Sequence, residues 1–99
     1  MRRVVITGLG AITPIGNSVS QMWESVKAGK CGIDKITLFD TTDRKVTLAG
    51  EVKNYVPEAF LDKREARKMD RYVQFAMAAA NEAMKDAGLD MEKEDTSRC

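Results

Sequence analysis

The fold of this chain is decided close to its start, by the stretch Arg3-Val4-Val5-Ile6-Thr7-Gly8-Leu9-Gly10-Ala11-Ile12-Thr13-Pro14-Ile15-Gly16. Its consecutive β-branched residues, 4–6, predict a strand, and the uninterrupted apolar run is typical of a strand covered on both faces. Gly8 and Gly10 then remove side chains where another backbone segment has to come close. Since a helix is predicted to follow Gly16, the chain opens as strand, glycine-rich turn and helix, which is the beginning of an α/β layer.

The first predicted helix covers residues 17–28. Ser18 and Gln21 have the spacing of a capping box, in which each side chain accepts a hydrogen bond from the backbone near the other residue. Gly29 suits the position just after the helix, where the chain turns left-handed. Trp23 lies on the apolar stripe of this helix, and we expect it to anchor the helix on the sheet rather than to stack on a ligand.

A less regular region follows this helix. Residues 30–43 are expected to form a long loop, with a turn at 40–43. Residues 46–52 alternate apolar and polar side chains in their first half and predict a second strand, within which Gly50 indicates a bulge or a close approach. Pro57 is placed to open a short helical turn.

The strongest helical pattern extends from Asp70 to about Ala87, and Gly88 is placed to end it. Its centre, residues 75–80, is apolar almost all round, which is typical of a helix covered on more than one side. Little of a 99-residue chain is left to provide that cover. We therefore expect the chain on its own to be poorly stable.

The composition allows one small globular domain at most. Of the 99 residues, 43% are hydrophobic and 31% are charged, and the net charge is +1. The near-neutral charge gives no reason to expect a nucleic acid or a membrane as partner. The N-terminal apolar run breaks at Thr7, which makes it too short for the hydrophobic region of a secretory leader, so a cytoplasmic location is expected.

No catalytic, cofactor-binding or metal-binding residue is assigned from the sequence. The chain has no histidine, which excludes within it a Ser/His/Asp or Cys/His relay and any histidine-ligated metal. Cys31 and Cys99 are expected to stay reduced, and nothing beside them would activate a thiolate. Gly8-x-Gly10 is half of a dinucleotide fingerprint, but Thr13 stands where the third glycine belongs. Backbone packing is therefore favoured over nucleotide binding as the reason for these glycines.

Positive charge is concentrated between residues 63 and 71, where five basic residues stand against two acidic ones. Arg64, Arg67 and Lys68 have the spacing that places side chains on one side of a helix, and such a patch suits an acidic partner. The alternative is an ordinary solvated helix start. Basic charge next to a helix N-terminus is unfavourable for the helix macrodipole, so stability alone does not explain the cluster.

Three pieces of the sequence, in the right order and with the right gaps, resemble the β-ketoacyl-[acyl-carrier-protein] synthases, the condensing enzymes of fatty-acid synthesis. They are V-V-I-T-G-L-G-A-I-T-P-I-G-N at 4–17, W-E-S-V-K-A-G-K-C-G-I at 23–33, and R-K-M-D-R at 67–71 with the alanine-rich helix that ends D-A-G-L at 86–89. The resemblance is to the elongating members of the family. The closely related polyketide ketosynthases stay open as an alternative.

The resemblance implies a thiolase-like α/β fold, of which residues 1–99 would form an incomplete N-terminal portion with the order strand, helix, strand, helix. It also implies a homodimeric acyltransferase. Such an enzyme joins a malonyl unit on acyl carrier protein to an acyl group held on a cysteine, with release of carbon dioxide and no cofactor. Neither Cys31 nor Cys99 matches the family's cysteine motif, and its two histidines are absent from these residues. The chain alone is therefore expected to be an inactive fragment.

The resemblance also assigns a role to the basic cluster. In the family, basic residues just ahead of the M-D helix dock the acidic carrier protein. Arg64, Arg67 and Lys68 match those positions, and the first is more usually lysine. Acyl carrier protein is therefore the partner that the resemblance implies. A stand-alone module that binds another acidic partner is the alternative from a different class.

Overall fold

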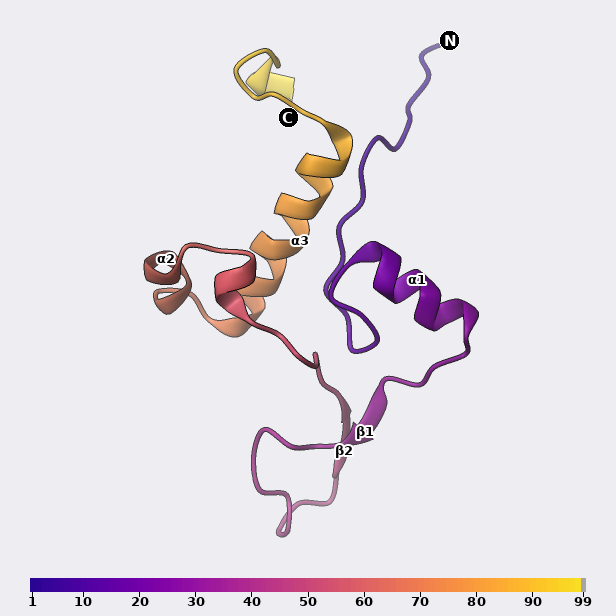
Figure 1. Ribbon diagram of the computed structural model, residues 1–99, viewed down its shortest axis with the longest axis vertical. Coiled ribbons are helices and arrows are strands. Elements are labelled where there is room, and N and C mark those ends of the chain that lie inside the picture. The colour runs from indigo at the N-terminus through magenta and orange to yellow at the C-terminus, as the bar shows by residue number, and fades with distance from the viewer. Residues whose placement is uncertain (99) are drawn as a thin grey trace.

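The computed structural model describes residues 1–98, so the expectation for Cys99 lies outside the described residues. Its elements follow the order α1 (Val19–Lys27), β1 (Ile33–Lys35), β2 (Leu48–Gly50), the 3-10 turn η1 (Pro57–Ala59), α2 (Lys63–Arg67), α3 (Arg71–Ala87) and a second 3-10 turn, η2 (Thr96–Arg98). Figure 1 shows them spread over an open shape, whose extents are 54 × 36 × 22 Å. The radius of gyration is 16.9 Å, whereas a compact domain of this length has about 13 Å.

The strand predicted at residues 4–6 is wrong for this structure. Residues 1–12 run extended without a ladder, and the described residues contain no segment that pairs with them. Val4 is 96% and Ile6 is 82% exposed. A strand forms only when a neighbouring strand satisfies its backbone groups, and a local apolar pattern does not supply that neighbour. The predicted order strand, helix, strand, helix is accordingly replaced by helix, strand, strand, helix, helix, with the 3-10 turns left aside.

The glycines of the opening stretch lie directly against α3, and Figure 1 shows the N-terminal trace beside this helix. A Cβ atom on Gly8 would overlap the carbonyl oxygen of Ala83, and one on Gly10 would overlap the carbonyl oxygen of Ala79. The two alanines lie four residues apart on one face of the helix. Close backbone packing, the favoured interpretation of these glycines, is therefore confirmed.

Two carboxylates of α3 hold this segment in place. Asp86 Oδ2 accepts a hydrogen bond from Leu9 N at 3.1 Å, and Glu82 Oε2 accepts one from Ala11 N at 3.4 Å. The other oxygen of Glu82 accepts a hydrogen bond from Val19 N, the first amide of α1, at 2.8 Å. Glu82 thus joins the extended segment, α3 and the N-terminus of α1, where a negative charge is also favourable for the helix dipole.

Helix α1 has the predicted boundaries within one or two residues. Ser18 Oγ accepts a hydrogen bond from Gln21 N at 3.2 Å, and the Gln21 side chain accepts one from Asn17 N at 3.0 Å. The capping box is therefore present, with its return bond shifted by one residue. Gly29 follows the helix with φ +69°. Trp23 is 55% exposed, so the expectation of a core anchor is wrong here, because the sheet that it would cover is not formed.

Strands β1 and β2 pair antiparallel, with Ile33 opposite Gly50 and Lys35 opposite Leu48. The region 30–43 is thus not loop throughout, and the strand predicted at 46–52 is reduced to three residues. A Cβ atom on Gly50 would lie 3.0 Å from Pro14 Cγ, which confirms a close approach at this glycine.

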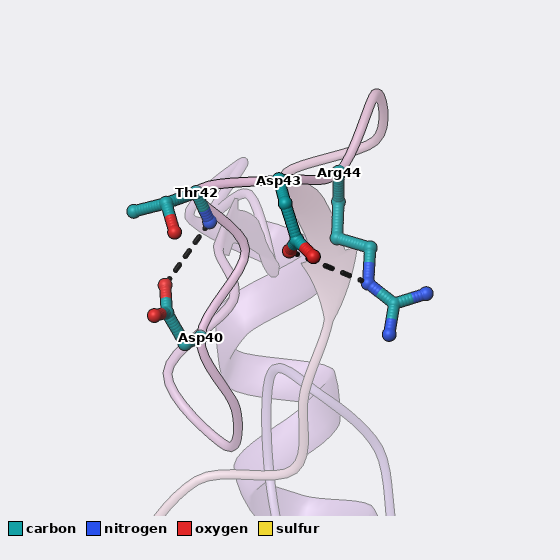
Figure 2. Close-up of polar contacts among 4 residues, drawn as sticks. All are labelled: Asp40, Thr42, Asp43 and Arg44. Atoms are coloured by element: carbon teal, nitrogen blue, oxygen red, sulfur yellow. Dashed lines mark hydrogen bonds and ion pairs between the residues drawn. The ribbon is translucent and has the colours of Figure 1, made fainter.

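The loop between β1 and β2 is closed by side-chain hydrogen bonds. Glu51 accepts from Thr37 N, Thr37 Oγ1 and Leu38 N at 2.9 to 3.1 Å. The hydrogen bonds from Thr37 hold the pKa of Glu51 below its usual value. Figure 2 shows the tip of the loop, where Asp40 accepts from Thr42 N at 3.0 Å and Asp43 lies 3.8 Å from Arg44. The predicted turn in this region is therefore confirmed.

Helix α3 ends as its sequence predicts. Gly88 has φ +67°, and Leu89 N donates to Met84 O at 3.4 Å, as in a left-handed helix C-terminus. Only Ala66 and Ala78 are buried apolar residues in the described part of the chain. Met77, in the apolar centre of α3, is 40% exposed. The expectation that this helix lacks cover is therefore confirmed.

The first prediction concerns the stability of the 99 residues by themselves. A core of two buried alanines contributes far less than the conformational entropy that folding costs. We expect thermal melting followed by far-UV circular dichroism to be broad, and ANS fluorescence to be high before heating. A soluble monomer with one sharp, cooperative transition would contradict this prediction.

The second prediction concerns the contact between Gly10 and α3. In a folded protein that contains these residues as its first segment, Gly10→Ala should lower the free energy of unfolding by about 3 kcal/mol, because the atom that the new methyl group meets is a backbone oxygen. Gly29→Ala is the matched control, since nothing lies near its Cβ position and only about 1–2 kcal/mol of backbone strain is added. Chemical denaturation measures both variants, and an equal or smaller loss for Gly10→Ala contradicts the prediction.

Candidate functional site

The basic residues singled out in the sequence lie on and just after α2. The structure places Arg64 and Arg67 within this helix and Lys68 at its C-cap, with helical backbone angles. With 3.6 residues per turn, the three side chains fall within about 100° of one another around the axis. All three residues are exposed. The prediction of a single basic face required this segment to be helical, and the structure shows that it is.

The opposite side of α2 is turned toward the protein. Ala66 is only 5% exposed, and its position lies about 150° around the helix from the centre of the basic face. The amide of Ala66 donates to Asp62 O at 2.9 Å. The burial of Ala66 thus explains why the cationic side chains point outward.

The basic face forms no ion pair within residues 1–98. The ion pairs there join Lys27 to Glu24, Arg44 to Asp43 and Lys93 to Asp90. None of them involves α2, and exposed pairs of this kind contribute little to stability. The cations of the basic face therefore keep their full capacity to bind an external anion.

Arg71 belongs to the same charged stretch but plays a different role. Its guanidinium lies 5.4 Å from the ring centroid of Tyr55 and 5.0 Å from that of Phe75, within cation–π range. It also donates to Val52 O at 3.3 Å. Because Arg71 interacts with residues of this chain, the net charge of the stretch overstates how much positive charge is available to a partner.

An aromatic cluster lies beneath Arg71, between η1 and α3. The ring of Tyr55 stacks on Phe60 at 5.8 Å and meets Phe75 edge-on at 4.8 Å. Burial raises the pKa of Tyr55, and its hydroxyl has no hydrogen-bond partner among the described residues. Sequence reasoning did not identify this cluster, since its members are separated by up to 20 positions and no periodic pattern connects them.

The described residues offer little for catalysis or for a nucleotide. Cys31 is exposed, and its thiol lies 3.7 Å from Ile33 O. Residues 1–98 contain no group of His, Cys, Asp and Glu that could hold a metal ion, and no helix long and apolar enough to cross a membrane. At the N-terminus of α1, the first amide is bonded to Glu82, so a phosphate there would meet a carboxylate. This geometry does not support nucleotide binding.

A cleft of about 440 Å³ lies between residues 13–18 and Lys53. The ammonium of Lys53 donates to Pro14 O, Gly32 O and Glu51 O at 3.2 to 3.3 Å. Lys53 therefore links three chain segments instead of facing a ligand as a free cation. The basic face of α2 remains the candidate functional site.

The chain matches the model of the β-ketoacyl synthase N-terminal domain over residues 1–99. It is 54% identical over 97 residues to the 3-oxoacyl-[acyl-carrier-protein] synthase 2 of Staphylococcus aureus (strain COL), covering 98% of this chain and 23% of that protein. It is 45% identical over 97 residues to the protein of the same name from Coxiella burnetii (strain RSA 493 / Nine Mile phase I), with the same coverage. The chain thus spans about a quarter of the length of these curated relatives.

Two solved structures have a similar fold. The ishigamide ketosynthase/chain length factor is 38% identical, with a TM-score of 0.82 over 92% of this chain and 23% of that chain. A type II polyketide ketosynthase (AntDE), in complex with its acyl-carrier protein (AntF) and bound to the hexaketide, is 32% identical. Its TM-score is 0.67, and the match covers 95% of this chain and 21% of that chain. By sequence and by fold, the chain belongs to the β-ketoacyl synthase family, and its residues match the N-terminal domain model of that family.

Proposed function

We propose that the chain is the N-terminal part of a 3-oxoacyl-[acyl-carrier-protein] synthase of type 2, an acyltransferase of fatty-acid biosynthesis. The main support for this proposal is that nearly the whole chain matches the synthase relatives, while the match covers less than a quarter of their length. The exposed apolar surfaces of residues 4–6 and α3 support it, because such surfaces need cover from further protein. The whole enzyme would join a malonyl unit to an acyl group with loss of carbon dioxide, as a cytoplasmic homodimer.

Within that enzyme, residues 1–99 supply scaffold and part of the docking surface for acyl carrier protein. The docking residues are Arg64, Arg67 and Lys68. Their exposure, their common face and the absence of an ion pair to them in residues 1–98 support this role. A related ketosynthase has been solved in complex with its acyl-carrier protein, which makes a carrier the natural acidic partner. Charge complementarity of this kind accelerates association and selects the partner.

The alternative function is that of a polyketide ketosynthase segment. The similarity in fold to a type II polyketide ketosynthase favours it. The synthase of fatty-acid biosynthesis is preferred because the sequence identity to its members is higher. Product analysis of the full-length enzyme with fatty-acyl and polyketide starter thioesters distinguishes the two.

The third prediction tests the docking surface by charge reversal. In a full-length synthase that carries this chain as its N-terminal segment, Arg64→Glu and Arg67→Glu should each weaken carrier-protein binding about tenfold, because attraction becomes repulsion. Arg44→Glu, at the tip of the β1–β2 loop and away from α2 in Figure 1, is the matched control and should leave binding unchanged. Titration at two salt concentrations measures the effect, which salt should reduce.

An equal affinity for the Arg64→Glu, Arg67→Glu and unaltered proteins would contradict the docking role. Tight binding of the carrier protein by the isolated chain would instead favour a stand-alone binding module. Loss of binding in Arg44→Glu as well would show a general effect of net charge.

The fourth prediction concerns catalysis by the chain alone. The sequence has no histidine, and no activated cysteine is found among the described residues. We therefore expect no condensation product from the 99 residues in an assay with radiolabelled malonyl-carrier protein. Product above the enzyme-free background would refute this expectation.

A further inference from the structure

Gln74, in the first turns of α3, is bonded to the end of α2. Its side-chain Nε2 donates to Ala66 O at 2.8 Å and to Met69 O at 3.2 Å, and both hydrogen bonds are partly buried. The carbonyl groups at the C-terminus of a helix have no partner within the helix. Ala66 O also accepts a hydrogen bond from Met69 N at 3.2 Å, so the carboxamide of Gln74 gives Ala66 O an additional donor and supplies a donor to Met69 O, in the link to α3.

Helix α2 needs such an external connection, because it has only five residues. Isolated helices much longer than this are marginal in water. Asp62, at its N-cap, makes no capping hydrogen bond through its side chain. The burial of Ala66 anchors the middle of the helix, but one small side chain does not fix how the helix is rotated about its axis.

We propose that Gln74 is a positioning residue for the basic face, and that it fixes the direction in which Arg64, Arg67 and Lys68 present their charges to the carrier protein. This inference rests on the proposed docking function. Gln74 lies on the protein side of α2 and makes its hydrogen bonds to backbone atoms, so it acts through the helix and not by touching the carrier.

The consequence of losing Gln74 differs from that of losing a charge. Without the carboxamide, Ala66 O keeps its backbone donor, but both it and Met69 O lose the connection to α3, so the end of the short helix frays more readily. All cations remain, but they must be ordered when the carrier binds. That ordering weakens binding, whereas the chemical step is unchanged because Gln74 acts only on the backbone of α2 and its link to α3.

The test uses a full-length synthase that carries this chain as its N-terminal segment. Gln74→Met keeps the length and the helix propensity of the side chain and adds no charge, but it removes the donor. Asn81→Leu is the matched control, because it removes a carboxamide from the exposed side of the same helix, where it makes no hydrogen bond in the described structure. Steady-state kinetics compare malonyl-carrier protein with malonyl-N-acetylcysteamine, a thioester that has no carrier.

For Gln74→Met we expect KM for malonyl-carrier protein to rise about three- to tenfold, because side chains must be ordered on binding. We expect kcat, and KM for the carrier-free thioester, to stay unchanged. Asn81→Leu should change none of these values. Gln74→Asn, whose shorter side chain does not span both carbonyl groups, provides a second variant and should raise the same KM.

Three outcomes overturn the inference in different ways. If Arg64→Glu and Arg67→Glu raise KM for the carrier substrate but Gln74→Met and Gln74→Asn do not, the docking function stands and the positioning role is wrong. A parallel loss with both substrates also shows a general structural role for Gln74 and overturns the inference. If the arginine variants have no effect either, the docking function itself fails, and the positioning role fails with it.

Discussion

The contact between the glycine stretch and the alanine face of α3 is the interaction on which the rest of the structure depends. Gly8 and Gly10 let an extended backbone lie against Ala79 and Ala83, where any Cβ atom would collide with the helix. Glu82 then extends this contact to α1 through its second carboxylate oxygen. Segments more than 60 positions apart are thus held by small residues and carboxylates, with almost no buried apolar side chains.

Helix α3 connects this contact to the candidate docking surface. Its later turns carry the glycine contact, and its first turns carry Gln74 and the aromatic ring of Phe75. Arg71, at the start of α3, lies over the rings of Tyr55 and Phe75. It also donates a hydrogen bond to Val52 O, two residues after the end of β2. The orientation of α2 is therefore set by the same helix that holds the N-terminal segment.

The features that the sequence predicted correctly are local ones. The cap at Ser18, the left-handed residues Gly29 and Gly88 and the spacing of the basic face depend on residues within one or two turns of each other. The strand at 4–6 failed because its partner strand does not occur among the described residues. Trp23 is not covered as expected, because the sheet on which it would pack is not formed. The engagement of Arg71 and the hydrogen bonds of Gln74 depend on tertiary contacts between side chains and distant or non-periodic partners, for which the sequence has no pattern.

The position of the basic face is itself an argument for an external partner. Cations that precede the N-terminus of α3 oppose its dipole, at a cost that the negative charge of Asp70 at the N-cap partly offsets. Arg64 and Arg67 also lie in the last turn of α2, where positive charge is favourable for the dipole of that helix. Within residues 1–98, Arg64 and Arg67 form no ion pair that would compensate this cost. Both residues are exposed in this structure. A cluster of cations that is open to solvent and forms no ion pair within the described residues suits an anionic surface, since its attraction is realised only when that surface is present.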